Sequence, residues 1–91
     1  MPIEISRVEH LIRSGSIRVG MTHAELLSLL GVADDVGGIS RKYSHPSIYK
    51  YGEVQFVFPP CRSPVEANEQ GLMYAYIDDS DPGDEPIRLL G

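Results

Sequence analysis

Four side chains in this 91-residue sequence have the chemistry of soft metal ligands or nucleophiles: His10, His23, His45 and Cys61. A zinc knuckle or a helical His pair needs two ligands within a few residues of each other. Here every gap between neighbours in the set is longer than ten residues. Cys61 stands alone in a Pro-rich stretch that offers no local signature to activate a thiol. The spacing therefore predicts neither a metal site nor a catalytic cysteine.

An acidic run, residues 78–85, invites comparison with the calcium loop of an EF-hand. Counted from Asp78, Gly83 falls at the sixth position, as the loop requires. The twelfth position, which needs a bidentate Glu, is Leu89. A start one residue later loses the glycine. The run is therefore predicted to be a solvated acidic turn.

Other familiar catalytic motifs are missing from the sequence. Gly37 and Gly38 are not followed by Lys-Ser or Lys-Thr, so they do not form a phosphate-binding loop and are predicted to make a flexible turn. Neither Gly-x-Ser-x-Gly nor His-Glu-x-x-His occurs. We expect no enzyme activity and no cofactor. The alternative is a small metal-binding or enzymatic domain that uses His45, Cys61 and the acidic turn.

The residue types that stand out are those of a binding surface. Residues 41–51 combine bases with tyrosines in an otherwise acidic sequence. Tyr and Arg dominate many protein–protein contacts, and an aromatic ring covers a large area. Tyr also favours strands, so these rings could instead line a sheet. The predicted partner-binding residues are Arg41, Tyr43, Tyr49, Lys50, Tyr51, Tyr74 and Tyr76.

The charge distribution indicates which kinds of partner the protein can bind. The formal net charge is −5, and residues 53–91 carry eight acidic side chains against only Arg62 and Arg88. Such a surface repels phosphates, so we expect no nucleic acid and no membrane partner, and a basic protein is favoured. The single cysteine excludes an intrachain disulfide, and no signal peptide or membrane-spanning run is present. These features predict a cytoplasmic protein.

Two helices are predicted in the first part of the chain. Apolar residues at helical spacing indicate one helix over residues 3–14 and another over 23–30. The second has a capping box, in which Thr22 and Glu25 bond each other's backbone amides, and Gly31 ends it. Its apolar face is wide, so we expect it to lie between the first helix and a sheet.

The rest of the chain changes to a period of two, which is typical of strands. Strands are predicted over residues 47–51, 53–58, 72–77 and 86–90. Gly52 is either a bulge or the corner of a hairpin. A β-turn is predicted at 81–84, and the Pro-rich residues 59–71 are predicted to be a loop.

Several runs resemble known modules. IRVGMT (residues 17–22) and LLG (29–31), with Glu25 between them, resemble the helix-helix-sheet module of outer-membrane assembly lipoproteins of the SmpA/OmlA (BamE-like) type and of β-lactamase inhibitory proteins. The resemblance covers roughly residues 5–58 and implies a scaffold or protein-binding role. The lipidated N-terminal cysteine of the lipoproteins is missing. GISRKY (38–43), PSIYKYG (46–52) and VQF (54–56) resemble small bacterial cytosolic proteins whose activity is unknown.

These observations together predict one α+β domain, residues 1–91, with two N-terminal helices packed on one face of a three- to four-stranded antiparallel sheet. The expected function is that of a bacterial cytosolic protein-binding module, such as an immunity or inhibitor protein. Besides the metal-binding or enzymatic alternative, a homo-oligomeric structural protein, for example a homodimer, is also compatible with the sequence.

Overall fold

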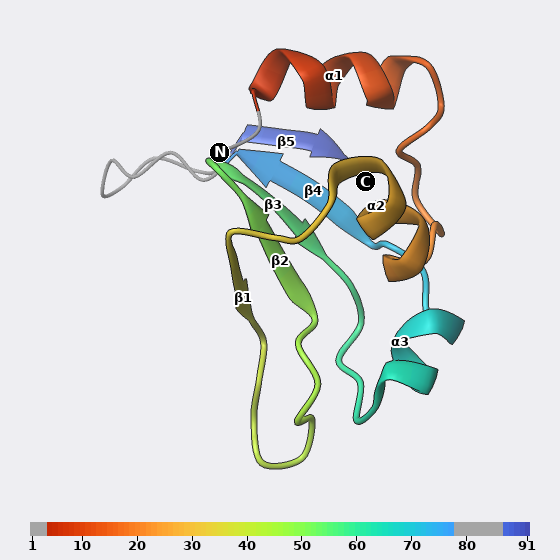
Figure 1. The fold of residues 1–91 in the computed structure, drawn as a ribbon, viewed down its shortest axis with the longest axis vertical. Coiled ribbons are helices and arrows are strands. Elements are labelled where there is room, and N and C mark those ends of the chain that lie inside the picture. Colours follow the sequence, from red (N-terminus) through yellow and green to blue (C-terminus); the bar gives the residue numbers. More distant parts are fainter. Residues whose placement is uncertain (1–3, 78–86) are drawn as a thin grey trace.

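The structure, a computed structural model, describes residues 4–77 and 87–91 (Figure 1). Its elements in chain order are α1 (Ile5–Arg13), α2 (His23–Leu30), β1 (Asp35–Gly37), β2 (Ile48–Tyr51), β3 (Val54–Val57), α3 (Pro64–Glu69), β4 (Tyr74–Ile77) and β5 (Ile87–Leu90). The predicted α+β class with its two N-terminal helices is confirmed. The described sheet has five strands, one more than the upper end of the prediction.

α2 begins and ends where its sequence signals place it. The Glu25 amide donates to Thr22 Oγ1 at 3.2 Å, and the Thr22 amide donates to Glu25 Oε1 at 3.3 Å. Gly31, with φ of 78°, follows the last helical residue. A left-handed residue at this position costs glycine nothing, which is why the helix stops there.

The sheet is an antiparallel meander in the order β1-β2-β3-β4-β5. Tyr51 pairs with Val54, so Gly52 and Glu53 form a two-residue hairpin turn. The φ of Gly52 is 62°, as the first central position of a tight hairpin turn requires. Gly52 is therefore a hairpin corner and not a bulge. β5 confirms the predicted last strand, whereas the turn predicted at 81–84 lies outside the described residues.

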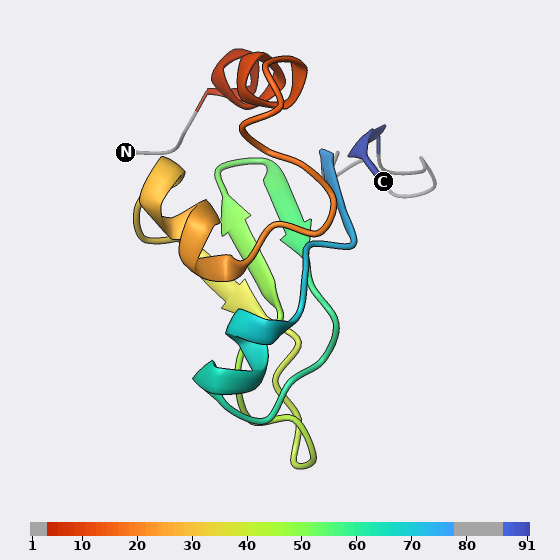
Figure 2. The same cartoon turned by 90° about the vertical axis from the view of Figure 1, so that its right-hand side faces the viewer.

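All three helices lie on one side of the sheet (Figure 2). The strands send alternate side chains to this side. Phe56 at the centre of the sheet is fully buried there, beneath Val8 of α1 and Leu26 of α2. The expectation that α2 is sandwiched between α1 and the sheet is wrong, because α2 packs beside α3 while α1 packs over β5.

Two elements were missed by the sequence prediction. α3 occupies part of the segment predicted as a loop: the Glu66 amide donates to Ser63 Oγ at 3.3 Å, and a proline fills the first helical turn. These are ordinary helix-start signals. The neighbouring prolines are more typical of a loop, which is why the sequence prediction missed this helix. β1 includes Gly37, which was predicted to be in a turn. Within the described residues, no helix is long and apolar enough to cross a bilayer.

Candidate functional site

The fold divides the seven predicted partner-binding residues among three places. The helix-covered face of the sheet holds Tyr49 and Tyr51. Cross-strand pairing puts Lys50 of β2 and Tyr76 of β4 on the opposite face, each opposite Gln55. Tyr74, two residues before Tyr76, shares that face. The third place is the loop between β1 and β2, which contains Arg41 and Tyr43.

Tyr49 and Tyr51 are core residues, with only 4% and 2% of their surface exposed. The Tyr51 hydroxyl donates to the Gly31 carbonyl at 2.7 Å and so ties β2 to the end of α2. The Tyr49 hydroxyl donates to the Pro46 carbonyl at 2.9 Å. Burial raises the pKa of Tyr49 to about 12. Their assignment to a partner surface is thus corrected, because a docked protein cannot reach side chains that the helices cover.

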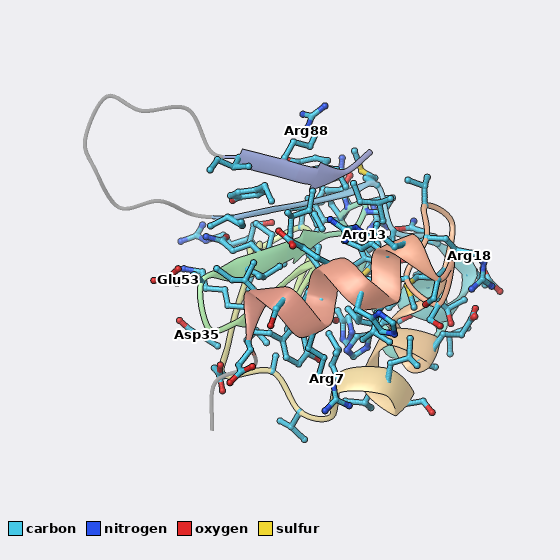
Figure 3. The ribbon with its side chains drawn as sticks, turned by 90° about the horizontal axis from the view of Figure 1, so that it is seen from above. Arg7, Arg13, Arg18, Asp35, Glu53 and Arg88 are labelled. Carbon is cyan, nitrogen blue, oxygen red and sulfur yellow. The ribbon has the colours of Figure 1, made fainter. Side chains whose placement is uncertain are left out.

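The opposite face, which we call the open face, carries an ordered aromatic pair. Tyr74 and Tyr76 stack with ring centroids 5.8 Å apart. The Arg88 guanidinium lies 5.0 Å from the centroid of the Tyr74 ring, within cation–π range. The Tyr76 hydroxyl donates to Gln55 Oε1 at 3.0 Å. Figure 3 shows Arg88 pointing away from α1 and α2.

The open face combines apolar surface with charges of both signs, because the register puts Asp35 of β1 opposite Lys50. Ile48 pairs with Val57 across β2 and β3, and both side chains are half-buried. Among the described residues, no helix covers this face of the sheet (Figure 2). The face therefore presents aromatic and aliphatic side chains beside Arg88, and Tyr and Arg are residue types enriched in protein–protein contacts.

A second basic and aromatic cluster lies at the end of the β1–β2 loop. The Ser40 amide donates to the Tyr43 carbonyl at 2.8 Å, and the Tyr43 amide donates to Ser40 Oγ at 3.1 Å, which closes a turn. Lys42 Nζ is 5.5 Å and Arg62 Cζ 6.0 Å from the centroid of the Tyr43 ring. We call Arg41, Lys42, Tyr43 and Arg62 the basic tip. Arg62 belongs to it through the fold, since it is distant in sequence.

The fold also gathers three of the four soft ligands, His23, His45 and Cys61, whereas His10 lies on α1. His45 and Cys61 face each other in an isolated antiparallel bridge. The Tyr49 hydroxyl lies 3.3 Å from His45 Nε2. The His23 ring stacks on Tyr49, with centroids 3.9 Å apart and planes 11° from parallel. Sequence reasoning gave no sign that these residues, on a helix, a strand and two loops, would meet.

This cluster has the chemistry of packing rather than of catalysis. Cys61 is only 1% exposed, and its thiol points to the Pro46 carbonyl, 3.8 Å away. Burial, and secondarily the Glu66 carboxylate, raise the pKa of the thiol, so the nucleophilic thiolate is disfavoured at neutral pH. In residues 4–77 and 87–91, no three His, Cys, Asp or Glu side chains converge on a point that could hold a metal ion. The acidic turn of the alternative hypothesis lies outside these residues.

A shallow depression of about 500 Å³ beside α2 offers no stronger candidate. Its lining includes Ser28, Leu29 and Glu25. The Glu25 carboxylate is already engaged by the helix cap and by Arg18, which donates to it at 2.9 Å. The open face and the basic tip are therefore the better candidates. Comparisons of the chain with protein-family models, with curated proteins and with solved structures found no match.

Proposed function

We propose that this chain is a cytoplasmic protein-binding module, such as an inhibitor or immunity protein, and that a partner docks on the open face. The observation that carries the proposal is the stacked pair Tyr74 and Tyr76 on the side of the sheet opposite the helices. Burying two aromatic rings is among the largest contributions that a pair of side chains makes to a protein contact.

The aromatic pair is already ordered in the unbound chain. The Tyr74 ring contacts both the Tyr76 ring and the Arg88 guanidinium, and the Tyr76 hydroxyl is bonded to Gln55. Fixing a mobile side chain on binding costs about 0.5–1.5 kcal/mol. Rings that are already fixed avoid most of this cost. Preorganised tyrosines therefore favour binding more than equally exposed but mobile tyrosines would.

The charge nearest the aromatic pair favours an acidic group on the partner. Arg88 stands opposite Tyr76 and over the Tyr74 ring. Lys50, by contrast, stands opposite Asp35, and the whole chain has a formal net charge of −5. The net charge alone favours a basic partner. At physiological ionic strength, however, charges are screened over about 8 Å, so the groups within contact distance decide the complementarity.

The experiment is a capture assay with the folded chain as bait in an extract of its source cells. The variant Tyr74→Ala/Tyr76→Ala should lower the recovered partner by about tenfold or more, as expected for central aromatic contacts. Val32→Ala/Val65→Ala is the matched control, because both valines are strongly exposed, 86% and 68%, and lie outside the strands, Val32 in the α2–β1 connection and Val65 in α3. The control should retain the partner.

A partner retained by the tyrosine variant at wild-type yield would contradict the proposal. Thermal melting of each variant separates loss of binding from loss of folding. The same face could also pack against a second copy of the chain. Light scattering of the wild-type protein tests this: a dimer that the tyrosine variant converts to a monomer would assign the open face to self-association, the structural role that the sequence left open.

A further inference from the structure

The basic tip is a second site, and we infer that it binds an acidic segment of a protein partner. This inference rests on the proposed function. It adds that a second part of the partner, separate from the part that docks on the open face, is acidic. The tip lies at the far end of the β1–β2 loop, at the bottom of Figure 1, with α1 at the opposite end of the molecule. The two predicted tip residues, Arg41 and Tyr43, are joined there by Lys42 and Arg62.

Positive charge is concentrated in the segment that builds the tip. Residues 36–62 contain four Lys and Arg residues against one acid, Glu53, which gives a formal charge of +3. The remaining residues contain four bases against twelve acids, a formal charge of −8. Three of these four bases, Arg41, Lys42 and Arg62, belong to the tip, while the acids Asp34, Asp35 and Glu66 border the segment on either side. The tip is therefore the place where an anionic group is attracted.

The bases of the tip have no carboxylate partner in the part of the chain that the structure describes. There, one ion pair is formed, at 2.9 Å, between Arg18 in the α1–α2 connection and Glu25 of α2. Glu66 is close to Arg62, but its carboxylate accepts a hydrogen bond from the Arg62 backbone amide. The guanidinium and ammonium groups of the tip can therefore take up carboxylates from outside.

The backbone of the tip is fixed in advance of binding. Two hydrogen bonds close the turn between Ser40 and Tyr43. The Ser44 hydroxyl donates to the Arg62 carbonyl at 3.3 Å, which holds the segment before α3 against the β1–β2 loop. The Tyr43 ring then positions two cations by cation–π contact. A guanidinium held this way can bind a carboxylate through two parallel hydrogen bonds.

The charge pattern favours an acidic protein segment over nucleic acid. A nucleic acid strand carries a phosphate at every nucleotide and gains affinity from many phosphate contacts. Beyond the tip it would meet a chain with a large excess of acidic residues. A short acidic segment of a protein can be satisfied by the tip alone, without extending over the repelling surface.

The test uses a fluorescently labelled glutamate decapeptide and the full chain, with binding followed by anisotropy at low ionic strength. We expect measurable affinity that falls as salt is added. Arg41→Ala/Lys42→Ala should weaken binding about tenfold, the scale of losing two charge-assisted contacts. Arg7→Ala/Arg13→Ala is the matched control: it removes two bases from α1 (Figure 3), and we expect less than about a twofold change.

Three results would overturn the inference. Wild-type protein that does not bind the peptide excludes the site. Equal weakening by the two double variants shows general electrostatic attraction. An oligothymidylate of equal charge that binds more tightly than the peptide shows a nucleic-acid preference. Tyr74→Ala/Tyr76→Ala should leave peptide affinity unchanged, so failure at the tip and failure at the open face are seen separately.

Discussion

The helix-covered face and the open face of the sheet each carry two tyrosines in very different surroundings. Tyr49 and Tyr51 are almost fully buried, and their hydroxyls donate to backbone carbonyls. Tyr74 and Tyr76 are half-buried and stack on each other beside Arg88. The residue type is the same, and the face of the sheet to which each ring points decides whether it joins the core beneath the helices or stays half-buried on the open face.

The largest expected contrast is in stability, between one core residue and one open-face residue. Phe56→Ala on the covered face should lower the free energy of unfolding by about 3–5 kcal/mol, because Phe56 is fully buried and leaves a cavity. Tyr74→Ala on the open face should lower it by about 1 kcal/mol, mainly through the lost ring stacking. Urea denaturation measures both values.

Equal losses in these two variants would break the comparison between the faces. Phe56→Leu serves as the control for the core position, because it keeps most of the apolar volume and should recover much of the lost stability. A Phe56→Leu protein as unstable as Phe56→Ala would point to a specific requirement for the ring, for example its edge contact with Tyr51 at 5.7 Å between centroids.

The predictable part of this fold is the part with local signals. The capping box of Thr22 and Glu25 and the stop at Gly31 specified α2 to the residue. The same kind of signal begins α3, with Ser63 and Glu66. Because α3 has little apolar periodicity, its sequence predicts a loop. β1, three residues long, is too short to show a period of two, and it exists because β2 pairs with it.

The candidate site was only partly accessible from sequence for a different reason. Alternation shows that neighbours such as Tyr49 and Lys50 face opposite ways, but it does not show which face the helices cover. That depends on long-range packing, including the register that the Gly52 hairpin imposes on β2 and β3. Arg62 could not be assigned to the tip at all, because it is brought there by contacts between segments far apart in sequence, the bridge of His45 with Cys61 and the hydrogen bond from Ser44 to Arg62.

The second contrast compares the loss of stability when one tyrosine hydroxyl is removed from each face. Tyr51→Phe removes the donor to the Gly31 carbonyl, which then lies beside a buried apolar ring, and should cost about 1–2 kcal/mol of unfolding free energy. Tyr76→Phe removes a hydrogen bond to Gln55 on the half-buried open face and should cost about 0.5 kcal/mol. A larger loss at Tyr76 would show that the open face contributes more to folding than its exposure suggests.

The smallest expected effect is a dependence of stability on pH that arises on the covered face only. His23 stacks on Tyr49 on the covered face, whereas the open face has no histidine. Burial, and secondarily the nearby His45, lower the pKa of His23 below its usual 6.5. The unfolded chain therefore takes up this proton at a higher pH than the folded chain. The His23 contribution to stability is fully present above the unfolded pKa and is lost as pH falls toward the lowered one.

The melting temperature of the wild type should thus fall as pH is lowered from about 7.5 to about 5.5, a range above most carboxylate titrations. His23→Gln should reduce this slope, although the variant also loses the ring stack and starts from a lower melting temperature. His10→Gln is the control, since it removes an exposed imidazole from α1 and should keep the wild-type slope. Parallel slopes in wild type and His23→Gln would mean that the covered face holds no proton-sensitive contact at His23. Its stacking on Tyr49 would then contribute to packing alone.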